Sequence, residues 1–238
     1  MTERGSDAGR ASDVGKVGKV GVIGVVEQVG TVAELHGLDP FAGDEPAVPA
    51  VWWCRPTDDA IVLGSRQRDD VVDAEACRRA GLSVVRRRSG GGAVVMRRSS
   101  ILWIDVVLPH GVAPDDVRGS MVWIGDRWRD VLAPIVDEPL TVHRGGMECS
   151  VWSDLVCFAG VGPGEVLVGP DKLVGLSQRR TRRGIRIQGL VYGASAAGEY
   201  RSVLRGTLPG EAPGGQAWQP DLDGAAIAAA LAGRITTV

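Results

Sequence analysis

The sequence predicts an α+β domain with a mixed, largely antiparallel β-sheet that is flanked by helices. Short apolar runs typical of strands outnumber helical patterns along the chain. Most of the connections between these runs are of hairpin length, which argues against a doubly wound parallel sheet with crossover helices. The chain has 238 residues and is 44% hydrophobic, which is enough to bury one core with a small appendage.

The first predicted strand covers residues 20–26 and follows a polar, glycine-rich tail, residues 1–20, that we expect to be disordered. Residues 101–108 form the clearest later strand, because this run is rich in β-branched and aromatic side chains and stops at Pro109. The other predicted strands cover residues 51–55, 60–63, 82–87, 93–96, 151–158, 165–168, 173–177 and 185–192.

Two amphipathic helices are predicted between these strands. The first can be capped by Asp69 and Asp70 and ended by Gly81. Its apolar face comprises Val72, Ala76 and Ala80. The second follows Pro114, because apolar residues recur there at spacings of three and four. These residues are Val117, Met121, Ile124, Trp128 and Leu132.

The C-terminal part has a different composition. An Ala-rich helix is predicted over residues 222–231, after a stretch rich in proline and glycine over residues 208–215. We therefore expect one main domain over residues 21–205, followed by a linker and a short C-terminal helix over residues 206–238.

Composition and charge argue against several classes of function. The formal net charge of −2 at pH 7 does not suit a general nucleic-acid or membrane binder. The N-terminal segment lacks an apolar core of signal-peptide length, and the four cysteines show no CxxC spacing, so we expect a cytoplasmic protein with free thiols. His36, His110 and His143 have no zinc-ligand spacing, so we expect no metal site.

Residues 86–95, RRRSGGGAVV, form the most distinctive segment of the chain and lie between two predicted strands. Gly90, Gly91 and Gly92 allow a sharp bend and close approach of a ligand, and their N–H groups can bind an anion. Arg87 and Arg88 add charge-assisted hydrogen bonds to phosphate or carboxylate. The segment suits a phosphorylated or adenylated ligand, or else it is a glycine-rich hairpin with a basic edge. The phosphate-binding patterns GxxxxGK[ST] and GxGxxG are absent here.

Three motifs, in order along the chain, resemble those of the lipoate–protein ligase A family. Residues 87–94, RRSGGGAV, resemble its RRxSGGGAV signature, and residues 62–67, VLGSRQ, are similar to its hydrophobic-Gly-x-x-Gln strand end. Residues 171–180, DKLVGLSQRR, resemble its GRKIxGxAQxR segment. The resemblance extends over residues 48–195 and implies a biotin/lipoyl protein ligase-like (class II synthetase-like) catalytic domain.

The resemblance also implies an activity. Lipoate or octanoate would be activated with ATP, accompanied by Mg²⁺ as its counter-ion, and the acyl group would be attached to a lysine of a carrier domain. The residues that it implies for binding ATP and the acid are Arg87, Arg88, Ser89, Gly90, Gly91, Gly92, Ala93, Gly175, Ser177 and Gln188.

Lys172 is the first catalytic candidate. Residues 166–177 predict a β-hairpin with a turn at Pro170 and Asp171, so Lys172 lies where the second strand leaves the turn. A lysine there can reach an acyl carbonyl or a phosphate as a compact charge. The resemblance implies contact with the activated acyl group, and the alternative is an ordinary solvated hairpin lysine.

Cys157 is the second candidate. It lies in the apolar run 151–158, where a free cysteine is usually a small core residue. Cys157-Phe158 resembles a Cys-Phe pair in the octanoyltransferases of the family, in which the thiol forms an acyl thioester and no ATP is used. A nucleophilic thiol also needs access and basic neighbours.

Two departures from the family pattern concern the reaction itself. Met96 and Arg97 stand where many members have His-Asp, and Gln188-Gly189 stands where many have His-Gly. Three hypotheses therefore stay open: an ATP-dependent ligase, an octanoyltransferase that uses Cys157, and a binding protein that kept the pocket without the chemistry.

The resemblance implies a lipoyl domain or a glycine-cleavage H-type protein as the acceptor, and we expect no nucleic-acid or membrane partner. Arginines at positions 97, 98, 179, 180, 182 and 183 would form a basic rim that steers an acidic carrier domain, or simply a solvated face. A separate accessory chain would complete the family's usual arrangement, because little sequence follows residue 195. We assign no function to Phe41, Trp103 and Asp126.

Overall fold

A computed structural model describes residues 23–43, 48–192, 197–210 and 222–235. The strands are β1 (Gly24–Gly30), β2 (Ala50–Pro56), β3 (Ala60–Leu63), β4 (Ser83–Arg86), β5 (Val94–Met96), β6 (Ile101–Pro109), β7 (Leu140–Val142), β8 (Val166–Val168), β9 (Asp171–Thr181) and β10 (Gly184–Tyr192). The helices are α1 (Val32–Gly37), α2 (Ala74–Arg79), α3 (Val117–Leu132), α4 (Ala197–Val203) and α5 (Gly224–Ile235), with 3-10 turns at Asp69–Val71 and Cys157–Ala159.

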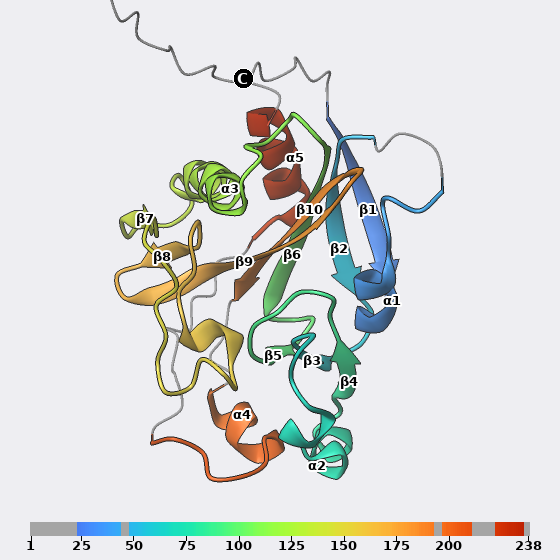
Figure 1. Cartoon of the computed structure of the whole chain (residues 1–238), viewed down its shortest axis with the longest axis vertical. Coiled ribbons are helices and arrows are strands. Elements are labelled where there is room, and N and C mark those ends of the chain that lie inside the picture. Colours follow the sequence, from blue (N-terminus) through green and yellow to red (C-terminus); the bar gives the residue numbers. More distant parts are fainter. Residues whose placement is uncertain (1–22, 44–47, 193–196, 211–221, 236–238) are drawn as a thin grey trace, which may run out of the picture.

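Two β-sheets organise these elements (Figure 1). The larger sheet has seven strands in the order β1-β2-β6-β10-β9-β8-β7, and the smaller has three in the order β4-β3-β5. The pairs β1–β2 and β3–β4 are parallel, and the other strand pairs are antiparallel. The predicted α+β class with a mixed, largely antiparallel sheet is therefore confirmed.

Side chains along β10 point alternately to the two faces of the larger sheet, and each face is covered by different elements. Ile185, Ile187 and Val191 belong to the main core, together with residues of α3 and α5. Gln188 and Leu190 point to the opposite face, where the smaller sheet and α1 pack. The candidate site lies on this second face. At the far end of the molecule, α2 and α4 lie beside the smaller sheet (Figure 1).

The helix predicted after residue 114 and the Ala-rich C-terminal helix are confirmed as α3 and α5. α5 packs against β2 and α3, and it buries Ile227 and Leu231 in the main core. None of the helices in the described ranges is long and apolar enough to cross a membrane.

The helix predicted from Asp69 is shorter than expected. Residues Asp69–Val71 form a 3-10 turn, and Asp73 is the cap of α2, because its carboxylate accepts hydrogen bonds from two backbone N–H groups of the first turn. Val72 therefore lies before the helix and pairs with Leu204 in an isolated bridge.

The prediction of a strand over residues 151–158 is wrong. This segment forms turns that end in the 3-10 turn Cys157–Ala159, and Val156 forms a single bridge with Ala93. The side chains of Ser150 and Ser153 accept hydrogen bonds from nearby backbone N–H groups. Such local bonds compete with a strand ladder, which explains why apolar composition alone misled the prediction.

Smaller differences concern the ends of elements. The first strand begins at Gly24 and not at residue 20, and the predicted tail lies outside the described residues. The β8–β9 hairpin is confirmed, but its turn consists of Gly169 and Pro170, while Asp171 pairs with Val168. Gly169 adopts φ +53°, a conformation that glycine adopts without strain. α1, β7 and α4 do not follow from the sequence patterns above.

Candidate active site

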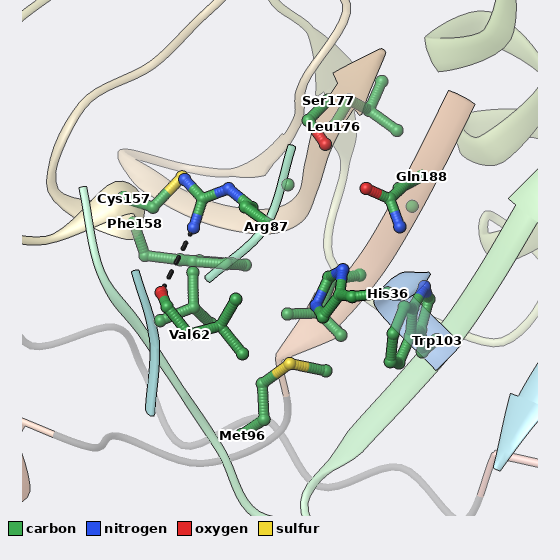
Figure 2. Close-up of a pocket in the computed structure, with 14 residues that line it drawn as sticks. His36, Val62, Arg87, Met96, Trp103, Cys157, Phe158, Leu176, Ser177 and Gln188 are labelled. Carbon is green, nitrogen blue, oxygen red and sulfur yellow. Dashed lines mark hydrogen bonds between the residues drawn. The ribbon is translucent and has the colours of Figure 1, made fainter. Parts of the chain in front are cut away.

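A cavity lies between the smaller sheet and the face of the larger sheet formed by β6, β10 and β9 (Figure 2). Its lining is mostly apolar with a few polar groups, which is typical of a small-molecule site. The lining residues are His36, Val62, Arg87, Val94, Met96, Trp103, Cys157, Phe158, Gly175, Leu176, Ser177, Gln188, Gly189 and Leu190. Four of the predicted binding residues, Arg87, Gly175, Ser177 and Gln188, are thus among them.

The glycine loop, residues 89–92, lies beside this cavity. The buried guanidinium of Arg87 donates hydrogen bonds to the carbonyls of Gly90 and Gly92 at 2.6 and 2.8 Å, and to that of Val62 at 3.2 Å (Figure 2). Arg87 therefore holds the loop from inside by its carbonyls. Among the described residues, the N–H groups of Gly90, Gly91 and Gly92 have no hydrogen-bond acceptor. Gly90 and Gly91 are exposed, so their N–H groups can reach an anion, whereas Gly92 is buried.

The motif at residues 62–67 joins the glycine loop to the segment before Cys157. Gly64 approaches the loop so closely that a Cβ there would lie 1.9 Å from the carbonyl oxygen of Gly91. Gln67 accepts a hydrogen bond from the Gly64 N–H at 3.0 Å and donates to the carbonyl of Asp154 at 2.9 Å. Gly64 and Gln67 thus fix the loop against its neighbours.

The motif at residues 87–94 and the motif at residues 171–180 meet on the other side of the loop. The hydroxyl of Ser89 donates to that of Ser177 at 3.2 Å. Arg88 and Arg179 both donate to Oδ2 of Asp39, at 3.1 and 3.0 Å. Burial alone would raise the pKa of Asp39, but the hydrogen bonds from Arg179 and Arg88 lower this pKa below its usual value. Two guanidinium groups therefore converge on one anionic oxygen beside the loop.

Lys172 is buried beneath Cys157 and Phe158 and is not a solvated hairpin lysine. Its Nζ lies 2.7 Å from Oε2 of Glu165 and donates to the carbonyl of Cys157 at 2.9 Å. The Lys172 and Glu165 side chains are 2% and 5% exposed. Glu165 also accepts hydrogen bonds from the N–H groups of Gly162 and Leu176. The ammonium thus lies directly behind the cavity wall, in a position that Glu165 fixes.

Cys157 is half-buried and lines the cavity at its junction with the glycine loop. A Cβ built on Gly91 would lie 3.4 Å from its Sγ. Cys54 and Cys77 are buried, and Cys149 is exposed outside the cavity. Cys157 is therefore the cysteine that the fold places beside the predicted ligand-binding residues.

Residues 41–207, more than half of the chain, match the family model of the lipoyl protein ligase A/B catalytic domain. The chain belongs to this family. No curated protein sequence matches it.

Solved structures share the fold of this lipoyl ligase family member at low sequence identity. Protein Ta0514 of Thermoplasma acidophilum with bound lipoic acid is 16% identical with a TM-score of 0.59, over 78% of this chain and 72% of that one. A lipoate-protein ligase A bound with ATP is 16% identical with a TM-score of 0.59, over 89% and 82%. The bi-partite lipoate protein ligase of Thermoplasma acidophilum, described with its E2 lipoyl domain, is 16% identical with a TM-score of 0.63, over 90% and 81%.

In this lipoyl ligase family member, His36 and Trp103 also line the cavity, although the motifs did not indicate them. The imidazole of His36 stacks on the indole of Trp103, with ring centroids 4.5 Å apart and planes inclined by 37°. His36 comes from α1, which is too short to give a periodic pattern. The capping box of Thr31 and Glu34 is the sequence signal that could have indicated this helix.

A buried ion pair holds α1 against the larger sheet. Asp105 and Arg186 approach to 2.6 Å, and their side chains are 0% and 5% exposed. Arg186 also donates to the carbonyls of Leu35 and Leu38 at the C-terminal end of α1, at 2.9 and 2.6 Å. These bonds fix the helix that carries His36, and so they fix the position of its imidazole.

The residues that depart from the family pattern lie in two different places in the structure. Met96 and Gln188 line the cavity, and the amide of Gln188 donates to Asp105 at 3.3 Å. Arg97 is paired with Glu199 of α4 and with Asp59, so it does not contribute to a free basic rim.

Burial of His36 leads to a pH-dependent stability. Burial, together with the nearby Arg186 and Arg87, lowers the pKa of His36 to about 3. In the unfolded chain a histidine has a pKa of about 6.5, so it takes up a proton as the pH falls below that value. The folded protein binds this proton only near pH 3, so the free energy of unfolding decreases as the pH falls from about 6.5 to about 3.

We expect His36→Phe, which keeps an aromatic ring but cannot be protonated, to lose less stability than the wild type between pH 7 and pH 4.5. The difference should be about 2 kcal/mol in the free energy of unfolding, measured with urea. Parallel stability curves for the two proteins would contradict a His36 that stays neutral in the folded protein.

Proposed function

We propose that this protein is a lipoate–protein ligase-like enzyme, which activates lipoate or octanoate with ATP and attaches the acyl group to a lysine of a carrier domain. One observation carries the proposal: β9 contributes Gly175, Leu176 and Ser177 to the cavity lining, the glycine loop lies beside the cavity, and Lys172 lies behind the wall at Cys157. The apolar part of this cavity suits an acyl chain, and the free N–H groups of the loop suit a carboxylate or phosphate.

The proposed reaction has two steps. A carboxylate oxygen of the acid attacks the α-phosphorus of ATP, and the bond from this phosphorus to pyrophosphate breaks. The amine of the carrier lysine then attacks the acyl carbonyl of the adenylate, AMP leaves with the electrons of the C–O bond, and the amine loses a proton. Mg²⁺ would accompany ATP as the counter-ion of its phosphates.

The chain's own groups would supply position and charge. Arg88 and the N–H groups of Gly90 and Gly91 would hold the phosphate region. Lys172 would polarise the acyl carbonyl, and Glu165 would keep its ammonium in place. In this proposal Ser89, Gly92, Ala93, Gly175, Ser177 and Gln188 shape the binding cavity together with Arg87.

The direct test is ATP–pyrophosphate exchange with purified protein, with lipoate, octanoate and biotin supplied in parallel. We expect exchange with lipoate or octanoate and none with biotin, because the mostly apolar cavity suits an acyl chain and not the polar ureido ring of biotin. No ATP–pyrophosphate exchange with any of the three acids would contradict adenylation.

Cys157 supports a second candidate function, because its thiol lines the cavity beside the glycine loop. In this reaction the Cys157 thiolate attacks the carbonyl of an octanoyl thioester on a carrier protein, and the carrier thiol leaves. The acceptor lysine amine then attacks the Cys157 thioester, which gives the amide and restores the thiol.

Mass spectrometry after incubation with octanoyl carrier protein tests this alternative. An octanoyl adduct that persists in Cys149→Ser and is lost in Cys157→Ser would establish it, because Cys149 is exposed outside the cavity. Ligand-induced thermal stabilisation without turnover in either assay would indicate a binding protein that lacks the chemistry.

For the acceptor we propose a lipoyl domain or a glycine-cleavage H-type protein in the cytoplasm. The bi-partite Thermoplasma acidophilum ligase, described with its E2 lipoyl domain, supports the lipoyl domain as acceptor, and its two-part make-up motivates the proposal of a separate accessory chain.

A further inference from the structure

The imidazole of His36, which lines the cavity, has a nitrogen without a hydrogen-bond partner among the described residues. Its Nε2 is buried and has no hydrogen-bond partner in the described part of the chain. The imidazole lines the cavity and touches the Trp103 ring (Figure 2). Because an unpaired buried nitrogen is costly, native proteins seldom keep one without a reason, such as a partner that arrives with a ligand.

The strand register places this nitrogen far from the glycine loop. Gly175 of β9, Leu190 of β10 and Trp103 of β6 lie in one row across three strands. Neighbouring strands are about 4.8 Å apart, so Trp103 lies about 10 Å from β9. Ser177, also on β9, is bonded to Ser89 of the loop. An acyl chain whose carboxylate lies at the loop would therefore extend across β10 and end at His36 and Trp103.

The side chains of His36 and Trp103 favour an acyl chain whose far end is polarisable. An imidazole N–H can donate a hydrogen bond to a sulfur atom, which is a weak acceptor. Sulfur also makes favourable contacts with aromatic rings, here that of Trp103. The methyl end of octanoate offers no acceptor, so it would leave the imidazole unpaired. The sulfur ring of lipoate offers one.

We propose that His36, stacked on Trp103, is a specificity-determining residue that selects the dithiolane ring of lipoate over a straight saturated chain. The inference rests on the proposed function, because the direction of the acyl chain depends on a carboxylate at the glycine loop. It narrows the substrate from two acids to one.

Direct binding measured by calorimetry without ATP tests the inference. The probes are lipoate, octanoate and 5-cyclopentylpentanoate, which has the ring size and chain length of lipoate but carbon in place of both sulfur atoms. We expect the wild type to bind lipoate about tenfold more tightly than the carbocycle. In His36→Phe the ratio should fall to about threefold or less, because only the contacts of sulfur with aromatic rings remain.

His36→Gln separates recognition from a purely structural role, because the amide retains an N–H donor and should keep most of the preference for lipoate. If His36→Phe does not fold, His36→Ala gives the same comparison. Equal wild-type affinities for lipoate and the carbocycle, or an unchanged ratio in the Phe or Ala variant, would overturn the inference and leave the ligase proposal standing. Failure of all three acids to bind the wild type would overturn the ligase proposal itself.

Discussion

Lys172→Met is expected to lower the rate of ATP–pyrophosphate exchange by roughly 100-fold or more. Methionine keeps most of the length and the apolar stem of lysine, so the change removes mainly the ammonium that would polarise the acyl carbonyl. The measurement is exchange at saturating acid and ATP, which reports the chemical step and not only binding.

Stability must be separated from catalysis in this variant, because Lys172 and Glu165 form a nearly buried pair with a nitrogen–oxygen distance of 2.7 Å. Removing one partner leaves the other charge buried and alone, at a cost of about 3–5 kcal/mol in the free energy of unfolding. Lys172→Met combined with Glu165→Gln removes both charges and should recover most of that loss.

The double variant therefore decides between the two roles. A folded double variant that stays inactive would support contact of Lys172 with the acyl group. Near wild-type exchange in the same protein would show that Lys172 only neutralises Glu165 and supports the wall of the cavity. Glu165→Gln alone measures how much the position of the ammonium matters.

The parts of the fold that the sequence predicts are those with a long or repeated pattern. The spacing of apolar residues from Val117 to Leu132 predicts α3 because sixteen residues repeat one period. α1 has six residues and β7 has three, too few for a period to be visible. The segment before Cys157 forms turns and not the predicted strand, because the hydrogen bonds of Ser150 and Ser153 are local and outweigh apolar composition.

The candidate site was predictable where a short segment carries the chemistry, as in the glycine loop. It was not predictable where two distant residues must meet. A carboxylate in the apolar strand of Asp105 and an arginine in that of Arg186 each signal a buried partner. Only the strand register, which sets Asp105 opposite Gln188, shows that Arg186 is its diagonal neighbour. For His36, the cavity position follows from that ion pair, which anchors α1.

Gly92→Ala is expected to destabilise the protein by about 1–3 kcal/mol and to abolish binding of the acyl acid. A Cβ on Gly92 would lie 2.6 Å from the backbone N and C of Val156 and 2.8 Å from the backbone N of Cys157. These are main-chain atoms of the segment that bridges to Ala93, so they cannot move aside without shifting the cavity wall. Urea unfolding and calorimetry with lipoate and octanoate measure the two effects.

Gly90→Ala is the matched control for stability, since it makes the same chemical change two positions away. A Cβ on Gly90 would meet only the end of the Arg66 side chain, at 3.8 Å, which is an ordinary contact. Its free energy of unfolding should therefore change by less than about 0.5 kcal/mol. An equal loss in the free energy of unfolding in Gly90→Ala and Gly92→Ala would mean that the stability depends on the backbone flexibility of the loop and not on the close contact at Gly92. A large loss in Gly92→Ala alone would mean that glycine is required at this position because the loop packs directly on the backbone beside Cys157.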